Sequence, residues 1–249
     1  MAVRYDGGAI GDAPILEGMS NPGRRLTRFD DFFAAPATQG FQLVELNDSG
    51  TDFVATITNL DEHGGVISLN TIGSAADDGV QLGSDAEFIS LAGKEFHFEA
   101  SVRFATSAGA TPSGAAFVGM AVTPGTAALT GASIHNLNDM IGFQIDPDDS
   151  DSLDFVSIKD DTETKLADVA VIASSSAATP GIGISAFCKL GFRFRNGELT
   201  AFIDGEKVGT VETNIPTDEP LGISIAVTNG NTAAACVLCV DYVMVSSER

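Results

Sequence analysis

The feature that most constrains this fold is the strict alternation of apolar and polar residues along residues 95–104. The apolar positions are Phe96, Phe98, Ala100, Val102 and Phe104. The polar positions are Glu95, His97, Glu99, Ser101 and Arg103. Successive side chains of a β-strand point to opposite faces, so this pattern predicts a strand with one face in the core and the other in water.

Shorter segments of the same kind follow one another along the chain, and no apolar stripe of helical period and length lies between them. They occupy residues 41–46, 53–57, 65–70, 115–122, 140–145, 155–158, 190–195, 199–203, 207–211, 223–227 and 237–245. About a dozen short strands without helices predict an all-β fold, either a sandwich or a barrel.

Two dipeptides predict how neighbouring strands connect. Asn196-Gly197 and Asp204-Gly205 each separate two apolar segments, and both pairs supply the positive φ angles of tight hairpin turns. Three consecutive antiparallel strands should therefore follow one another here. Small and polar residues fill the segments 106–114 and 174–183, which predicts surface loops.

The charge excludes several classes of function. The 249 residues include 34 acidic and 13 basic side chains, which gives a formal net charge of −21. Binding to nucleic acid or to anionic lipid requires a basic surface, so neither partner is expected. Basic, neutral or cation-bridged partners fit this charge better. The length is sufficient for a single large core.

The first 28 residues differ from the rest, because glycine and proline interrupt every short apolar stretch in them. We expect residues 1–28 to form an extended arm and residues 29–249 to form a single β-sandwich domain. Arg24, Arg25 and Arg28 are the candidate anchors to carboxylates of a neighbouring subunit. The alternative is an ordinary loose terminus.

Cysteine content and hydropathy bear on the compartment. Residues 1–14 lack the basic and then apolar pattern of a secretion signal, so none is expected, and no apolar run approaches the ~18 residues of a membrane span. Its three cysteines do not suggest a disulfide scaffold. Cys236 and Cys239 fall inside a predicted strand, so they are expected to be buried apolar residues rather than a redox pair.

Several segments together resemble a known family. They read GGVISLNTIGSAADDGVQL, KEFHFEASVRF, AAFVGMAVT, DMIGFQID, KLGFRFRNGELTAFIDGEKVGTV and CVLCVDYVMV. This series is similar to the concanavalin A-like, or laminin G-like, jelly rolls found in virion proteins of tailed bacteriophages. The resemblance covers roughly residues 40–245, and it implies an antiparallel β-sandwich.

The same resemblance implies a non-enzymatic capsid decoration or cement protein that needs no cofactor. Its partners would be the major capsid protein or other virion subunits, and neither nucleic acid nor membrane. It would be a homo-oligomer, with a trimer suspected, located on the capsid surface after synthesis in the host cytoplasm. A shell-forming jelly roll is a further reading of the same pattern.

A different function class remains open, because concanavalin A-like folds also include glucanases whose catalytic strand resembles E-x-D-x-E. Glu95, His97 and Glu99 match that spacing, with histidine in place of the central acid. The alternative is therefore a carbohydrate-binding adhesin, a fibre module or a catalytically decayed glucanase-like domain, with an open cleft lined by these residues. The absence of tryptophan argues against a saccharide site, and an ordinary solvated strand face accounts for the same three residues.

One acidic segment is a candidate calcium site, because flexible carboxylates are ligands that Ca²⁺ prefers. The segment DPDDSDSLD supplies Asp146, Asp148, Asp149, Asp151 and Asp154. It is not an EF-hand loop, since Asp151 and Ser157 stand where that motif requires glycine and glutamate. A solvated hairpin tip is the alternative reading.

Overall fold

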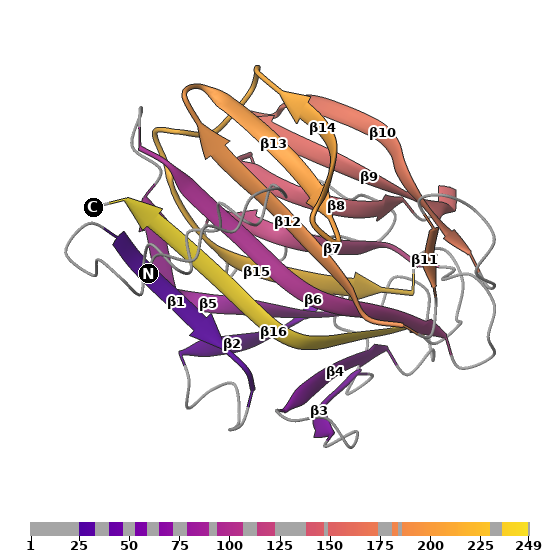
Figure 1. Ribbon diagram of the computed structural model, residues 1–249. Coiled ribbons are helices and arrows are strands. Elements are labelled where there is room, and N and C mark those ends of the chain that lie inside the picture. The colour runs from indigo at the N-terminus through magenta and orange to yellow at the C-terminus, as the bar shows by residue number, and fades with distance from the viewer. Residues whose placement is uncertain are drawn as a thin grey trace, which may run out of the picture.

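The computed structural model describes twelve stretches of the chain, and every structural statement below concerns them. They are residues 25–32, 40–46, 53–58, 65–71, 79–89, 94–106, 114–122, 138–146, 149–173, 181–183, 186–229 and 236–248. Within them the chain folds as two packed β-sheets (Figure 1). No helix in these stretches has the length and hydropathy needed to cross a bilayer.

The first sheet, sheet A, contains the strand that the alternation predicted, at its centre. Its order is β14 (Glu206–Val211), β13 (Glu198–Ile203), β12 (Cys188–Arg195), β6 (Phe96–Thr106), β16 (Cys236–Glu248), β4 (Val66–Thr71) and β3 (Phe53–Thr58). A further strand, β1 (Arg25–Asp30), pairs with the C-terminal half of β16. β4 pairs with the N-terminal half of β16, so β1 and β4 share one flank of this long strand.

The second sheet, sheet B, lies behind sheet A in Figure 1. Its order is β11 (Gly181–Gly183), β10 (Thr162–Ala173), β9 (Asp149–Lys159), β8 (Met140–Asp146), β7 (Ala116–Ala121), β15 (Pro220–Thr228), β5 (Gly79–Ile89) and β2 (Phe41–Leu46). Every pairing in the two sheets is antiparallel except that of β10 with β11. The antiparallel β-sandwich predicted from the sequence is confirmed.

The structure departs from the sequence predictions at four strands. Alternation identified neither β5 nor β10, because glycine and acidic residues interrupt the pattern of β5 and acidic residues interrupt that of β10. The expected loop at residues 174–183 is wrong at its end, where Gly181–Gly183 forms β11. β1 occupies the last residues of the predicted arm, residues 25–28, where no strand was expected. The two predicted hairpin turns are present, with positive φ at both residues of Asn196-Gly197 and Asp204-Gly205.

A chain of phenylalanine rings in mutual contact crosses the core from one sheet to the other. The ring centroid of Phe192 in β12 lies 4.8 Å from that of Phe98 and 6.1 Å from that of Phe96, both in the same sheet. It also lies 5.8 Å from Phe155 of β9, which in turn lies 5.0 Å from Phe143 of β8 in sheet B. These rings are almost completely buried. Their mutual packing fixes how the sheets face each other.

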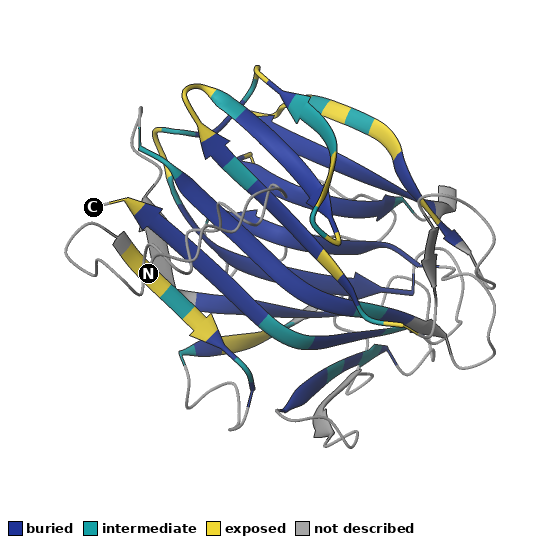
Figure 2. Ribbon diagram, viewed as in Figure 1, coloured by how far each residue is buried: buried dark blue, intermediate teal, exposed yellow. Residues whose placement is uncertain are grey.

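The faces that point away from this core are more buried than alternation predicted. His97, Glu99 and Ser101 of β6 are 1%, 3% and 4% exposed, so the expected solvated face of this strand is wrong (Figure 2). On sheet B, a second apolar cluster uses the alternate positions of β7, β8, β9 and β15. Alternation predicts which side chains point away from the core, and it does not predict whether other parts of the chain cover them.

The central position of Phe192 yields a stability prediction. Phe192→Ala should lower the free energy of unfolding by about 3–5 kcal/mol, because it removes a buried ring and leaves a cavity between the sheets. Val171→Ala is the control: Val171 is 41% exposed, so its truncation should change the free energy by no more than about 0.5 kcal/mol. Urea denaturation measures both. Equal effects for the two variants would contradict the role assigned to the ring stack.

Candidate functional site

Of the three residues that imitate a glucanase strand, His97 and Glu99 share one face of β6, and Glu95 directly precedes the strand. The register places His97 between Arg193 of β12 and Ser246 of β16. Glu99 lies between Gly191 and Met244 in the next row of the same face. The alternation of the strand, together with these pairings, thus gathers two carboxylates, an imidazole and a guanidinium on the side of sheet A away from the core.

Glu99 is the most enclosed acid of this row. Tyr242 of β16 donates a hydrogen bond from its hydroxyl to Oε1 of Glu99. Oε2 of Glu99 is buried, and no described residue gives it a hydrogen bond. Burial raises the pKa of Tyr242, and the hydrogen bond to Glu99 raises it further, so this phenol stays protonated as a donor. Opposite Glu99, the bare backbone of Gly191 leaves room for the glutamate side chain.

Glu95 has different partners. Its carboxylate lies 3.9 Å from Nε of Arg195, and its backbone N–H donates to Oε2 of Glu248 at 3.0 Å. Four residues of strand separate Glu95 from Glu99, a rise of about 13 Å. The carboxylates of glycosidases stand only about 5–9.5 Å apart. Since Glu95 and Glu99 bind different partners, the structure does not bring them together as a catalytic pair.

The open cleft predicted for this row is wrong as well. His97 and Glu99 are almost completely buried, so neither lines an open surface. These residues lie in a row, as their spacing predicted, but they form a buried polar cluster. Because Oε2 of Glu99 receives no hydrogen bond from the described residues, this cluster is only partly satisfied.

The predicted calcium loop is described only in part. Asp148 lies outside the described residues, and Asp149 and Asp151 are described only as backbone of β9. Asp154 accepts hydrogen bonds from Lys165 Nζ at 3.0 Å and from the backbone N–H of Asp168 at 2.8 Å. It thereby holds the irregular part of β10, where Asp168 has a positive φ.

Asp146 ends β8 and is half-buried. Within the described stretches no group of three or more acids, histidines or cysteines could hold a metal ion. Calcium binding by this loop stays a prediction. What the structure shows for Asp154 is a structural role, through its hydrogen bonds to β10.

The arm arginines are also only partly described. Arg24 lies outside the described residues, and Arg25 is described only as backbone, opposite Glu248. Arg28 packs its guanidinium over the ring of Phe41 at 4.2 Å and donates to the carbonyl of Gly40 at 3.2 Å. Arg28 therefore bridges the edges of the two sheets within this chain. The division of the chain at residue 28 stays a prediction.

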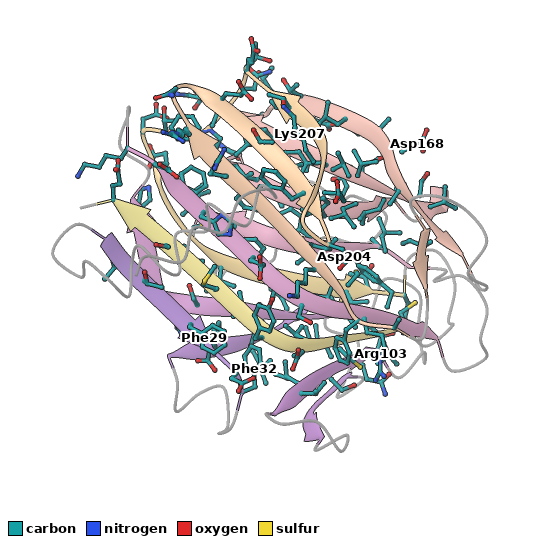
Figure 3. The ribbon with its side chains drawn as sticks, viewed as in Figure 1. Phe29, Phe32, Arg103, Asp168, Asp204 and Lys207 are labelled. Atoms are coloured by element: carbon teal, nitrogen blue, oxygen red, sulfur yellow. The ribbon has the colours of Figure 1, made fainter. Side chains whose placement is uncertain are left out.

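The three cysteines match their prediction. All are buried and free, and burial raises the pKa of the Cys188 thiol to about 12. Cys236 belongs to the core cluster. Cys239 faces away from the core. The guanidinium of Arg103 donates a hydrogen bond to its sulfur at 3.5 Å and also lies over the ring of Phe187 (Figure 3).

A cavity that the sequence did not suggest lies at one end of the sandwich. It has a volume of about 380 Å³ and an open mouth. Phe194 and Ile215 are its apolar lining residues. Its polar lining residues are Lys159, Glu212, Asn214 and Thr217, and Gly197 of the first hairpin turn completes the wall.

Hydrogen bonds hold the cavity wall in place. The backbone carbonyl of Asn214 accepts from Ser157 Oγ at 2.7 Å, and the Asn214 amide donates to Thr164 Oγ1 at 2.9 Å. Asn214 also has a positive φ, a conformation that asparagine tolerates better than most residues. The segment after β14 is therefore tied to β9 and β10 of the other sheet, and a ligand would meet a preformed wall.

One ion pair sets the charge at the cavity mouth. Lys159 Nζ lies 2.7 Å from Oδ1 of Asp218. That contact raises the pKa of Lys159 and lowers the pKa of Asp218, so both groups are charged at neutral pH. Since Asp218 neutralises Lys159, Glu212 is the unbalanced charge of the lining set.

Comparisons with known proteins place the fold. No family model matches the chain, and no curated protein matches it in sequence. Among solved structures, the β-glucanase of Bacillus licheniformis superposes with a TM-score of 0.57 at 13% identity, over 88% of this chain and 96% of that one. The carbohydrate recognition domain of Emp47p superposes with a TM-score of 0.58 at 10% identity, over 90% of this chain and 96% of that domain. The potassium-bound carbohydrate recognition domain of Emp46p superposes with a TM-score of 0.54 at 12% identity, over 84% of this chain and 88% of that domain.

At these identities the likeness establishes the fold, a concanavalin A-like jelly roll. It also corrects one prediction. The sequence argued for a protein without enzymatic activity, yet glucanases are among the structures that superpose over nearly the whole chain. The exclusion of enzymatic activity was therefore wrong. It rested on the resemblance to capsid decoration proteins.

Tyr242→Phe tests the buried cluster. The variant should lower the free energy of unfolding by about 1–3 kcal/mol, because Oε1 of Glu99 loses its hydrogen-bond donor while still buried. Combining it with Glu99→Leu should cost less than the two single effects added together, since the double variant leaves neither partner unpaired. Thermal and urea unfolding of the four proteins measure the coupling, and strictly additive effects would show that the contact has no energetic role.

Proposed function

We propose that this protein binds a neutral or amino-bearing saccharide in the cavity lined by Phe194, Glu212 and Asn214. The observation that carries the proposal is the composition of that cavity, which combines an apolar surface with several fixed hydrogen-bonding groups. Sugars present C–H faces beside hydroxyl groups, so they need both kinds of surface at once. The glucanase and carbohydrate recognition domains that share the fold support the same class of ligand.

The size and lining of the cavity suit one or two sugar rings. Its volume of about 380 Å³ falls within the range of small-molecule sites. Phe194 and Ile215 form the apolar part of the wall, and with 3% and 8% of their surface exposed they offer a sugar ring a small apolar contact. Glu212, Asn214 and Thr217 supply the acceptors and donors that hydroxyl groups require.

The charge of the site narrows the ligand further. Lys159 is balanced by Asp218, which leaves Glu212 as the net charge of the lining. The whole chain carries −21, so a sulfated or uronic-acid polymer would be repelled. A neutral sugar would donate hydrogen bonds from its hydroxyl groups to the Glu212 carboxylate, and an amino sugar would form an ion pair with it.

Capsid decoration, with the major capsid protein as partner and the capsid surface as location, stays a prediction. Of its three anchor residues, Arg28 is engaged with Gly40 and Phe41 of its own chain. The similar structures named above favour the carbohydrate alternative over the virion role.

Substitutions in the cavity wall test the proposal. A glycan array identifies the ligand, and calorimetry then compares Glu212→Gln and Thr217→Val with the wild type. Each variant should weaken binding by about tenfold, the effect of losing one well-placed hydrogen bond worth about 1.4 kcal/mol. The control is Glu206→Gln, which removes the same charge from an exposed position on β14 outside the cavity lining.

Two results would contradict the site. Wild-type affinity in both cavity variants would show that the saccharide binds elsewhere on the molecule. If no glycan binds, the proposed function is wrong. The same glycans should be assayed for release of reducing ends, because glucanases share the fold.

A further inference from the structure

Negative charge gathers at the end of the sandwich where the cavity opens. Among the described residues that line the cavity, Lys159 is the single cation and Glu212 is the single acid. The hydrogen bond that Lys159 donates to Asp218 raises the pKa of this lysine, and the charges of Asp160 and Asp139 raise it further. One lysine therefore has several carboxylates as neighbours, and acids determine the electrostatic potential at the mouth.

The same acids act on a carboxyl group that the fold encloses. Asp139 directly precedes β8, is 6% exposed, and accepts a hydrogen bond from the backbone N–H of Asp160 at 3.3 Å. Burial raises the pKa of Asp139 by more than this hydrogen bond lowers it, and the charges of Asp160, Asp218 and Glu219 raise it further. The acids at this end of the molecule thus repel one another, and a cation bound beside them would reduce that repulsion.

The ion pair at the mouth occupies the only lining cation that the structure describes. Lys159 Nζ lies 2.7 Å from Oδ1 of Asp218, so an acidic ligand would have to compete with Asp218 for this lysine. Glu212 differs, because none of the described residues forms an ion pair with it. A positively charged group of a ligand is therefore the partner that the cavity can pair without breaking an existing contact.

The rest of the lining distinguishes an amino sugar from a simple amine. Thr217 and Asn214 offer neutral hydrogen-bonding groups beside Glu212, and Phe194 and Ile215 add an apolar contact. An alkylammonium ion would use the carboxylate alone, whereas a sugar ring that carries an amine also uses the hydroxyl and amide groups through its own hydroxyls.

We propose that the cavity binds saccharides with a free, protonated amino group, which forms an ion pair with Glu212. This ligand class narrows the saccharide function proposed above, on which it rests. An N-acetylated sugar has a neutral amide at the same place and can offer Glu212 only a neutral hydrogen bond. Since a hydrogen bond between two charged groups is roughly twice as strong as a neutral one, Glu212 would select the amine over its acetylated form.

The charge of the ligand specifies how binding should respond to pH. An amino sugar is a cation only while its amine is protonated, so its affinity should fall as the pH rises through the pKa of that amine. Their mutual hydrogen bond raises the pKa of Lys159 and lowers the pKa of Asp218, so both protein groups keep their charges over that range. The affinity of an N-acetylated sugar should therefore stay constant, and the difference reports the amine of the ligand.

Calorimetry of the full chain tests this selection with two matched probes, the disaccharide of glucosamine and its fully N-acetylated form. The wild type should bind the amine form about tenfold more tightly. Glu212→Gln should abolish this preference, because the amide cannot form an ion pair. Glu206→Gln is the matched control, since it removes the same charge from an exposed residue of β14 outside the cavity lining, and it should keep the preference. Circular dichroism of the variants verifies that they fold.

A second variant tests the part played by the ion pair at the mouth. Asp218→Asn leaves Lys159 without the carboxylate that neutralises it. This variant should bind the disaccharide of glucosamine more weakly than the wild type, and it should bind the disaccharide of galacturonic acid about tenfold more tightly. Glu206→Gln changes the net charge of the chain by the same amount and should affect neither ligand.

Three results would overturn the selection of an amine. Equal affinity for the two glucosamine disaccharides, with both weakened by Thr217→Val, would keep the saccharide site and reject the amine as its determinant. A preference that Glu206→Gln and Glu212→Gln reduce equally would show only attraction to the acidic body of the protein. If neither disaccharide binds and a glycan array finds no other ligand, the saccharide function itself is wrong, and the amine selection fails with it.

Discussion

The packing of Phe192 against Phe98 on one side and Phe155 on the other is the contact on which the rest of this structure depends. It joins β12 and β6 of sheet A to β9 of sheet B, and Phe143 extends the stack to β8. Aromatic rings bury more area than other side chains and prefer a few relative orientations. Their stack therefore determines both the spacing of the two sheets and the relative position of the strand ends.

The cavity at the end of the sandwich follows from the same packing. Phe194 is two residues beyond Phe192 on the same face of β12, where it stacks on Phe96 at 5.5 Å and also lines the cavity. The apolar part of the proposed saccharide site is thus an extension of the core. The polar part comes from the end of β9 and from the segment after β14, which Ser157 and Thr164 hold in place through Asn214. The core thereby positions groups from both sheets around one opening.

The opposite flank of the molecule shows how the sandwich closes its edges. Arg28 reaches across from β1 to Phe41 at the end of the other sheet, and Asp30 accepts a hydrogen bond from the backbone of Phe32. Burial raises the pKa of Asp30, so an acid is kept at this position despite the cost of enclosing its charge. These contacts fix β1 as an ordered edge. Leu26 and Phe29 stay largely exposed on this edge, with the Phe29 ring centroid 5.6 Å from that of Tyr242.

The sequence by itself determined the all-β class, the central strand β6, the two tight hairpins and the side of β6 on which His97 and Glu99 lie. Each of these depends on local rules, namely the period of two and the positive φ of Asn-Gly and Asp-Gly turns. Only the tertiary structure decided that His97 and Glu99 are buried, that Arg28 serves the fold, and that Lys159, Phe194 and Glu212 meet around one cavity. Those outcomes depend on which distant strands become neighbours, and the pairing of β12 with β6 or of β10 with β9 leaves no periodic signal in the residues that end up facing each other.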